Sequence, residues 1–227
     1  MTNIFGTPEK RANRNGLFAA AVEALEGKGY KVERIARIGK SSVRRITKNG
    51  VGKTVSIRTS QDTWIAFPRN KTNDGWATLE DVDFVVAASV DNPDDPHFAK
   101  IHLIPADDMR ARFDRAYNAR LKADYQMQAG RGIWLSLYFP EANDPVTHVG
   151  AGAGLKHPAI AEIPLTPGSA PPPGGGGAEE TDEDLGAGEA HAYAKPDEQP
   201  LTIAEAKRRL ALSLGVSVDD IKITISG

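Results

Sequence analysis

Residues 53–60 of this chain, Lys-Thr-Val-Ser-Ile-Arg-Thr-Ser, most constrain what it can fold into. Their alternation places Val55 and Ile57 on one side of a strand, and Ser56 and Arg58 on the other. The residues before this strand predict an amphipathic helix and a basic hairpin, and those after it predict further strands. This order of elements is typical of an α+β domain built around a sheet.

Hydrophobic periodicity and turn signals predict one α+β domain over residues 1–148, with a mixed central sheet flanked by helices. The helices are expected over residues 14–29 and 107–125. The dipeptide Asn49-Gly50 marks a tight hairpin turn. The predicted strands are 31–38, 43–48, 53–59, 64–67, 84–90, 98–104 and 133–139, and the strand at 64–67 is expected to continue the meander begun by the first three.

Residues 149–200 are expected to form a disordered linker, because they combine Gly, Pro and acidic residues with few large apolar groups. Residues 201–227 predict a short helix followed by a strand in which Ile221, Ile223 and Ile225 alternate with polar residues. A unit this short cannot bury enough surface to fold alone. We expect it to dock on the main domain, to pair with another copy or to fold on a partner.

Composition favours a cytoplasmic protein. The chain has no cysteine, which excludes disulfides and Cys-ligated zinc, and it has neither an apolar signal region nor a membrane-spanning run. Its net charge of −2 hides an asymmetry: residues 1–60 carry 13 Lys and Arg against 4 Glu, or 13 − 4 = +9. Residues 168–199 carry one Lys against eight acids, or 1 − 8 = −7. A basic front favours a polyanionic partner.

The order of elements resembles the PD-(D/E)XK nuclease superfamily, whose central strand typically reads like Val-Gln-Val-Lys-Thr-Ser. Val82-Asp83-Phe84-Val85-Val86, followed by Ile101-His102-Leu103-Ile104-Pro105, resembles a branch of that family in which a strand reading VDFFVFV leads to a strand ending in Ile-Pro before a helix. The resemblance covers about residues 14–125 and rests on element order and apolar pattern. It implies a restriction-endonuclease-like fold.

In that family an Asp and a Glu/Gln-x-Lys pair hold a divalent cation beside the scissile phosphate. Here Ser56 stands at the Glu/Gln position and Arg58 at the Lys position, while Arg44 and Arg45 lie where the strand Asp belongs. Glu23 comes two turns too late for the first-helix acid. The resemblance therefore implies a nuclease fold without catalytic residues, metal or cofactor.

We expect the protein to bind nucleic acid, DNA or RNA, through phosphate contacts from a basic strip on the sheet, with Trp64 available to stack on a base. The strip is predicted to contain Arg44, Arg45, Lys53, Arg58, Arg69 and Lys71. The competing interpretation is a solvated sheet face with core tryptophans.

Two other functions stay open. One is a protein-interaction module in which residues 201–227 add a strand to a partner or to a second copy. The other is an active metal-dependent nuclease with a rearranged site using Asp62, Asp81 or Asp83.

Overall fold

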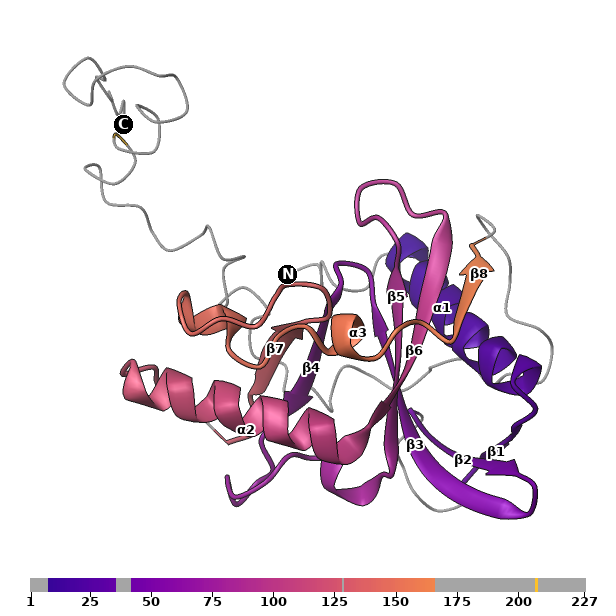
Figure 1. Ribbon diagram of the computed structural model, residues 1–227, viewed down its shortest axis with the longest axis horizontal. Helices are drawn as coiled ribbons and strands as arrows, with labels where there is room; N and C mark the ends of the chain where they lie inside the picture. The colour runs from indigo at the N-terminus through magenta and orange to yellow at the C-terminus, as the bar shows by residue number, and fades with distance from the viewer. Residues whose placement is uncertain (1–7, 36–41, 128, 166–206, 208–227) are drawn as a thin grey trace. The chain divides into compact units, whose positions relative to one another are not determined.

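The computed structural model describes residues 8–35, 42–127, 129–165 and 207 (Figure 1). Six strands form one mixed sheet in the order β1-β2-β3-β5-β6-β8. Neighbouring strands are antiparallel except for β3 and β5, which are parallel. The expected α+β class with a mixed central sheet is confirmed. The six strands are β1 (Lys31–Arg34), β2 (Val43–Lys48), β3 (Val51–Ser60), β5 (Phe84–Val90), β6 (Phe98–Pro105) and β8 (Ala161–Pro164).

Two further strands, β4 (Trp64–Pro68) and β7 (Gly132–Ser136), form a separate antiparallel pair. The prediction that β4 continues the meander is therefore wrong. The apolar strand β5 takes the position beside β3, with every residue after Phe84 buried. A strand covered on both faces belongs in the interior of a sheet, and β4 instead finds its partner far along the chain.

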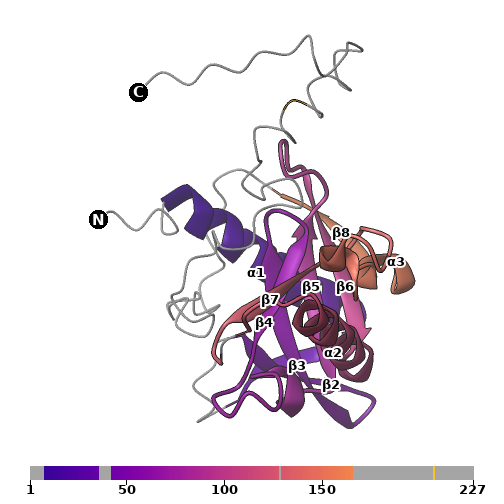
Figure 2. The same ribbon diagram turned by 90° about the vertical axis from the view of Figure 1, so that its left-hand side faces the viewer.

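The helices cover opposite faces of the six-stranded sheet (Figures 1 and 2). α1 (Pro8–Gly27) begins earlier than predicted and buries Leu17 and Leu25 in a core cluster with β3, β5 and β6. α2 (Ala106–Lys122) buries Met109 and Phe113 in a second cluster on the other face, together with β4 and β7. The described part of the first unit is thus layered as helix, sheet, and a helix beside a two-stranded sheet.

The folded domain continues past residue 148, where the sequence predicts a linker. The 3-10 turn η3 (Val146–His148) leads to the one-turn helix α3 (Ala153–Lys156), and β8 then pairs with β6. The run Gly150-Ala-Gly-Ala-Gly reads as linker, yet these glycines allow close packing. A Cβ at Gly154 would lie 2.9 Å from Cε1 of Tyr138, which is tighter than real side chains pack.

The chain divides into two units, Met1–Gly188 and Glu189–Gly227. The predicted linker beyond residue 165 and the predicted helix–strand unit at 201–227 lie outside the described residues, apart from Lys207. Among the described helices, none has the length and apolarity needed to cross a bilayer.

Candidate nucleic-acid interface

Three strands project past the centre of the sheet and carry a dense group of exposed cations. β5 pairs with β3 only from Val55 onward, so the first residues of β3 extend beyond it. We call β1, β2 and residues 51–54 of β3, with the turn Asn49-Gly50, the wing (lower right in Figure 1). Its sequence holds six Lys and Arg against one Glu, or 6 − 1 = +5. Five of these cations are exposed: Lys31, Arg34, Arg45, Lys48 and Lys53.

Arg45 lies flat across β3 because the strand has a glycine beneath it. A Cβ at Gly52 would meet Nη2 of Arg45 at 2.9 Å and Nε at 3.0 Å. Arg45 and Gly52 line a pocket of about 360 Å³ with Ile35, Lys53, Thr54 and Asp81. The exposed guanidinium at this pocket can give two parallel hydrogen bonds to a phosphate.

The lysines of the wing are partly engaged. Nζ of Lys53 pairs with Asp83 at 3.2 Å. The Thr54 backbone N–H donates to the same carboxylate at 2.8 Å, and this hydrogen bond leads the contacts that lower the pKa of Asp83. Nζ of Lys48 donates to the carbonyl of Lys28 just beyond α1 at 2.7 Å, which leaves two of its three N–H groups for other acceptors.

Arg44, one of the predicted strip residues, points to the opposite face from Arg45. It is only 6% exposed, and its guanidinium lies 5.0 Å from the ring centroid of Phe18 on α1. Burial lowers the pKa of Arg44, and the neighbouring charge of Arg34 lowers it further. Consecutive strand residues face opposite ways, so Arg44 and Arg45 do not belong to one strip.

Arg69 is likewise buried and lies away from the wing. Its guanidinium stacks between the rings of Trp76 and Tyr117, with centroid distances of 4.8 and 4.3 Å. Its Nε donates to Asn73 Oδ1 at 3.0 Å. This cation is used inside the fold, where it pins the loop after β4 to α2. Lys71 in the same loop is exposed, but it does not extend the wing.

The positions at which the resemblance locates a metal site are occupied by core packing. Ser56 is fully buried opposite Val43, which belongs to the α2-side core. The guanidinium of Arg58 lies 4.3 Å from the ring centroid of Phe67. Arg45 and Arg58 share this face, because Arg45 pairs with Thr54 and residues 54, 56 and 58 alternate to the same side. The positive charges of these two arginines would repel a metal cation on this face of β3. The ring of Phe67, on β4, fills the space beside Arg58.

Trp64 also lies apart from the wing, at the start of β4. Its ring packs edge-on against Phe139 at 5.4 Å, and its backbone N–H donates to Asp62. The structure thus exposes Arg45 and Lys53 on the wing, buries Arg44 on the wing's other face against α1, and distributes the remaining four predicted residues over the rest of β3, a loop and the second sheet.

The three acids considered for a rearranged nuclease site do not lie together. Asp81 lines the wing pocket and Asp83 lies beside it, whereas Asp62 follows the far end of β3 and accepts a hydrogen bond from Ser60. Over residues 8–35, 42–127 and 129–165, no three His, Cys, Asp or Glu side chains gather as metal ligands do.

Oxygen ligands also gather in the loop at residues 70–75, where hydrogen bonds already join them to one another. Asn70 Nδ2 and Thr72 Oγ1 each donate to Asp74 Oδ1 at 2.6 Å. These hydrogen bonds, Thr72 first, lower the pKa of Asp74, and the charge of Arg69 contributes. The polar side chains of this loop therefore serve as hydrogen-bond partners for one another and stabilise the turn.

Two polar clusters were missed by sequence reasoning. In the first, Ser89 Oγ lies 2.7 Å from Tyr138 Oη, which lies 2.9 Å from His102 Nε2. Nδ1 of His102 lies 2.7 Å from the carbonyl oxygen of His157 and must donate to it. In the neutral ring Nε2 then accepts from Tyr138, which in turn accepts from Ser89. Burial raises the pKa of Tyr138.

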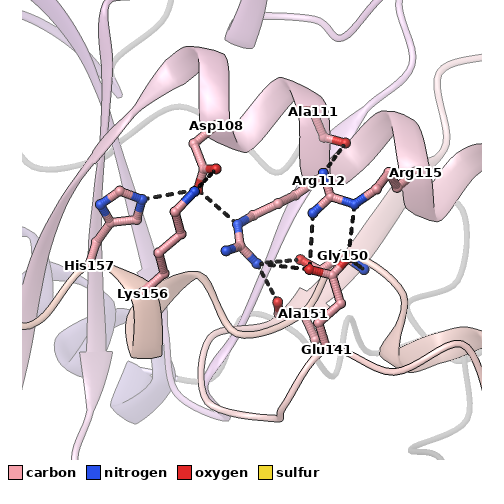
Figure 3. Close-up of polar contacts among 9 residues, drawn as sticks. All are labelled: Asp108, Ala111, Arg112, Arg115, Glu141, Gly150, Ala151, Lys156 and His157. Atoms are coloured by element: carbon pink, nitrogen blue, oxygen red, sulfur yellow. Dashed lines mark hydrogen bonds and ion pairs between the residues drawn. The ribbon is translucent and has the colours of Figure 1, made fainter.

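In the second cluster, Asp108 on α2 joins three cationic or polar side chains (Figure 3). It accepts hydrogen bonds from Arg112 Nε at 2.9 Å, Lys156 Nζ at 2.6 Å and His157 Nε2 at 3.0 Å. Partial burial alone would raise the pKa of Asp108, but the hydrogen bonds from Lys156, Arg112 and His157 outweigh it and hold it well below its usual range.

The same cluster continues to Glu141. Arg115 donates two hydrogen bonds to the Glu141 carboxylate, at 2.9 and 3.0 Å, and lowers its pKa. Arg112 also donates to the carbonyls of Gly150 and Ala151 (Figure 3). Both clusters thus hold the segment around α3 against α2 and β6. Within each cluster the polar side chains form hydrogen bonds with one another or with nearby backbone carbonyls. No motif spacing signals them, because their members come from segments far apart in the sequence.

Comparisons with protein-family models, curated proteins and solved structures found no match to this chain.

Proposed function

We propose that the protein binds nucleic acid through phosphate contacts made by the wing, without base readout and without nuclease catalysis. The observation that carries the proposal is the concentration of five exposed cations on three short strands that contain a single acid. Phosphate contacts of this kind supply sequence-independent affinity.

The pocket beside Arg45 supports the proposal further. Gly52 allows the guanidinium to lie across the strand, and Lys53 and Thr54 line the same pocket. Asp81 lines the pocket and Asp83 pairs with Lys53, and both acids limit the net attraction for phosphate. Because phosphate contacts release counterions, binding should depend strongly on salt.

The proposal also rests on how the polar residues at the nuclease-like positions are used. Ser56 is buried and Arg58 lies on the Phe67 ring, so neither is arranged to hold a cation beside a phosphate. The nuclease-like resemblance of the element order stays a proposal about ancestry and carries no catalytic step.

A salt-dependent titration tests the proposal. Fluorescence anisotropy would follow the binding of labelled DNA, RNA and heparin by the whole chain over a range of salt concentrations. We expect log affinity to fall with log salt by about 0.9 for each neutralised phosphate on duplex DNA. The double variant Arg45→Glu/Lys53→Glu should bind much more weakly and with a shallower slope.

Lys122→Glu is the matched control, because Lys122 is an exposed cation at the end of α2. It makes one such charge reversal away from the wing, half the change of charge of the double variant, and should leave affinity nearly unchanged. Full affinity of the double variant at low salt would refute the proposal. Equal binding to all three polyanions would reduce it to generic polyanion affinity.

A further inference from the structure

The exposed cations of the wing lie on both of its faces. Opposed residues of an antiparallel pair share a face, and alternate residues along a strand switch face. Arg34 pairs with Arg44, which packs on α1, so Arg34 belongs to the α1 side. Arg45 pairs with Glu33 and Thr54 on the opposite, pocket side. By the same register Lys48 and Lys53 originate on the α1 side, and Lys31 on the pocket side. The ammonium of Lys53 then reaches Asp83 beside the pocket, so Arg34 and Lys48 supply the charge of the α1 side.

The tip of the wing is a tight turn that carries one exposed apolar side chain. Asn49 and Gly50 form the turn with φ values of 52° and 77°, which is the two-residue hairpin geometry that keeps the strands closely paired. Val51 follows at the tip and is 60% exposed, the largest value among the exposed large hydrophobic side chains of the described chain. A narrow tip with cations on both faces behind it is a shape suited to a groove with anionic walls.

The wing has no ring on which an exposed base could stack. Residues 31–34 and 43–54 contain no Phe, Tyr, Trp or His. Two of the three tryptophans are used in packing: Trp64 lies against Phe139, and Trp76 is 1% exposed. The third, Trp134, lies on β7, outside the wing. Proteins that hold single strands rely on aromatic stacking as well as on a charged groove. The wing supplies the charges without the rings.

We propose that the wing inserts tip first into the major groove of double-stranded B-form DNA, with the cations of its two faces against the phosphates of the two strands. This inference rests on the proposed function and specifies its ligand. The major groove is about 12 Å wide and admits a two-stranded β-ribbon, which the β2–β3 hairpin supplies at the tip of the wing. The major groove of A-form RNA is deep and narrow, and side chains do not enter it. A duplex alone offers two phosphate backbones on either side of one inserted element.

The two faces are tested by one charge reversal on each. Arg34→Glu changes the α1 side, Arg45→Glu changes the pocket side, and Lys122→Glu is again the control. Anisotropy with a duplex DNA probe should show at least about fivefold weaker binding for each wing variant near 0.1 M salt, as loss of one phosphate contact predicts. The salt slope should fall by roughly one for each. Circular dichroism and thermal unfolding would verify that each variant is folded.

The ligand is tested by competition at one salt concentration. Unlabelled duplex DNA should displace the probe at a concentration at least about tenfold lower than single-stranded DNA or duplex RNA of equal length. Val51→Asp, which brings a negative charge to the tip, should weaken duplex binding more than Val51→Ala does.

The outcomes separate this inference from the function on which it rests. Loss of affinity in Arg45→Glu with none in Arg34→Glu would mean contact by one face, which overturns groove insertion and leaves nucleic-acid binding intact. Equal or tighter binding of single strands would overturn it as well. If the unmodified chain binds none of the three nucleic acids at low salt, both groove insertion and the proposed nucleic-acid binding are refuted.

Discussion

The imidazole Nε2 of His102 lies 2.9 Å from the phenolic oxygen of Tyr138, and this hydrogen bond ties β6 to the segment that follows β7. Because Nδ1 of the same ring donates to the His157 carbonyl, His102 connects the sheet to both ends of the segment that contains α3. His102 is 2% exposed, so water cannot readily replace a lost partner. Because His102 joins β6 to the segment containing α3, the stability of the fold should depend on the hydrogen bonds and the protonation state of this side chain.

Tyr138→Phe should destabilise the protein. The substitution removes the hydroxyl between Ser89 and His102 and leaves Nε2 of His102 buried without its donor. Leaving a buried polar group unsatisfied costs about 1–3 kcal/mol. Urea unfolding followed by circular dichroism measures the loss. Tyr125→Phe, at a partly exposed tyrosine beyond α2, is the control and should change little. Equal stability of the two variants would contradict the role given to the Tyr138 hydroxyl.

The free energy of unfolding should decrease in mildly acidic solution. Burial is the largest effect on the pKa of His102 and lowers it; the hydrogen bond to the His157 carbonyl opposes burial without reversing the shift, and the charge of Lys100 lowers the pKa further. An unfolded His titrates near about 6.5, so between that value and the lower folded pKa the unfolded chain binds more protons. The stabilisation is therefore complete above about pH 6.5 and is lost as the pH falls toward the folded pKa.

Urea unfolding at a series of pH values from 8 to 5 measures this dependence. His102→Gln removes the titrating group and should flatten the curve over the upper part of that range, whatever its effect on stability at neutral pH. The depressed pKa of Asp108 acts elsewhere, since its stabilisation is present above about pH 3.9 and is lost at lower pH. The same pH dependence in the His102→Gln variant would assign the effect to another group.

Asp108→Asn should cost about 2–4 kcal/mol, because it removes the nearer of the two carboxylates that face the buried Arg112 guanidinium. Asp107→Asn is a close control: it alters the adjacent residue in the first turn of α2, where the side chain is 92% exposed. That variant should change stability by less than about 0.5 kcal/mol. Chemical denaturation of both variants gives the comparison. A similar small effect at both positions would show that Glu141 alone balances Arg112.

Gly150→Ala should be more damaging than Gly130→Ala. Both glycines have positive φ, 83° and 77°, so an alanine is strained at either position. A Cβ at Gly150 would overlap the Arg112 carbonyl, whereas a Cβ at Gly130 would have no heavy atom within 4 Å. We expect about 1 kcal/mol at Gly130 from backbone strain and about 3 kcal/mol or more at Gly150 from strain and overpacking together. Comparing the thermal unfolding of the two variants separates the cost of backbone strain, which both share, from the cost of overpacking, which only Gly150→Ala has.

Several strands and both long helices were predictable because their signals are local. β2 spans the predicted residues 43–48, and Asn49-Gly50 forms the expected turn. Alternation along β3 correctly separated Val55 and Ile57 from Ser56 and Arg58. Such patterns depend on residues within one or two turns of backbone, so the sequence alone carries them.

The candidate interface was predicted only in part. Arg45 and Lys53 lie on the wing, whereas Arg44 and Arg69 are buried against aromatic rings. The basic composition of residues 31–54 is visible in the sequence. The sequence does not show whether a helix or water covers a given cation of a strand. The rings that receive these guanidinium groups belong to α1, α2 and the loop after β4.

The amino-acid sequence by itself determined the α+β class, the hairpin and the excess of cations near the N-terminus. Only the tertiary structure decided that β4 pairs with β7, that the fold continues through β8, and which arginines reach solvent. The first group depends on spacing along the chain. The second depends on contacts between distant segments competing for the two faces and the open edges of one sheet, and those contacts are settled by packing.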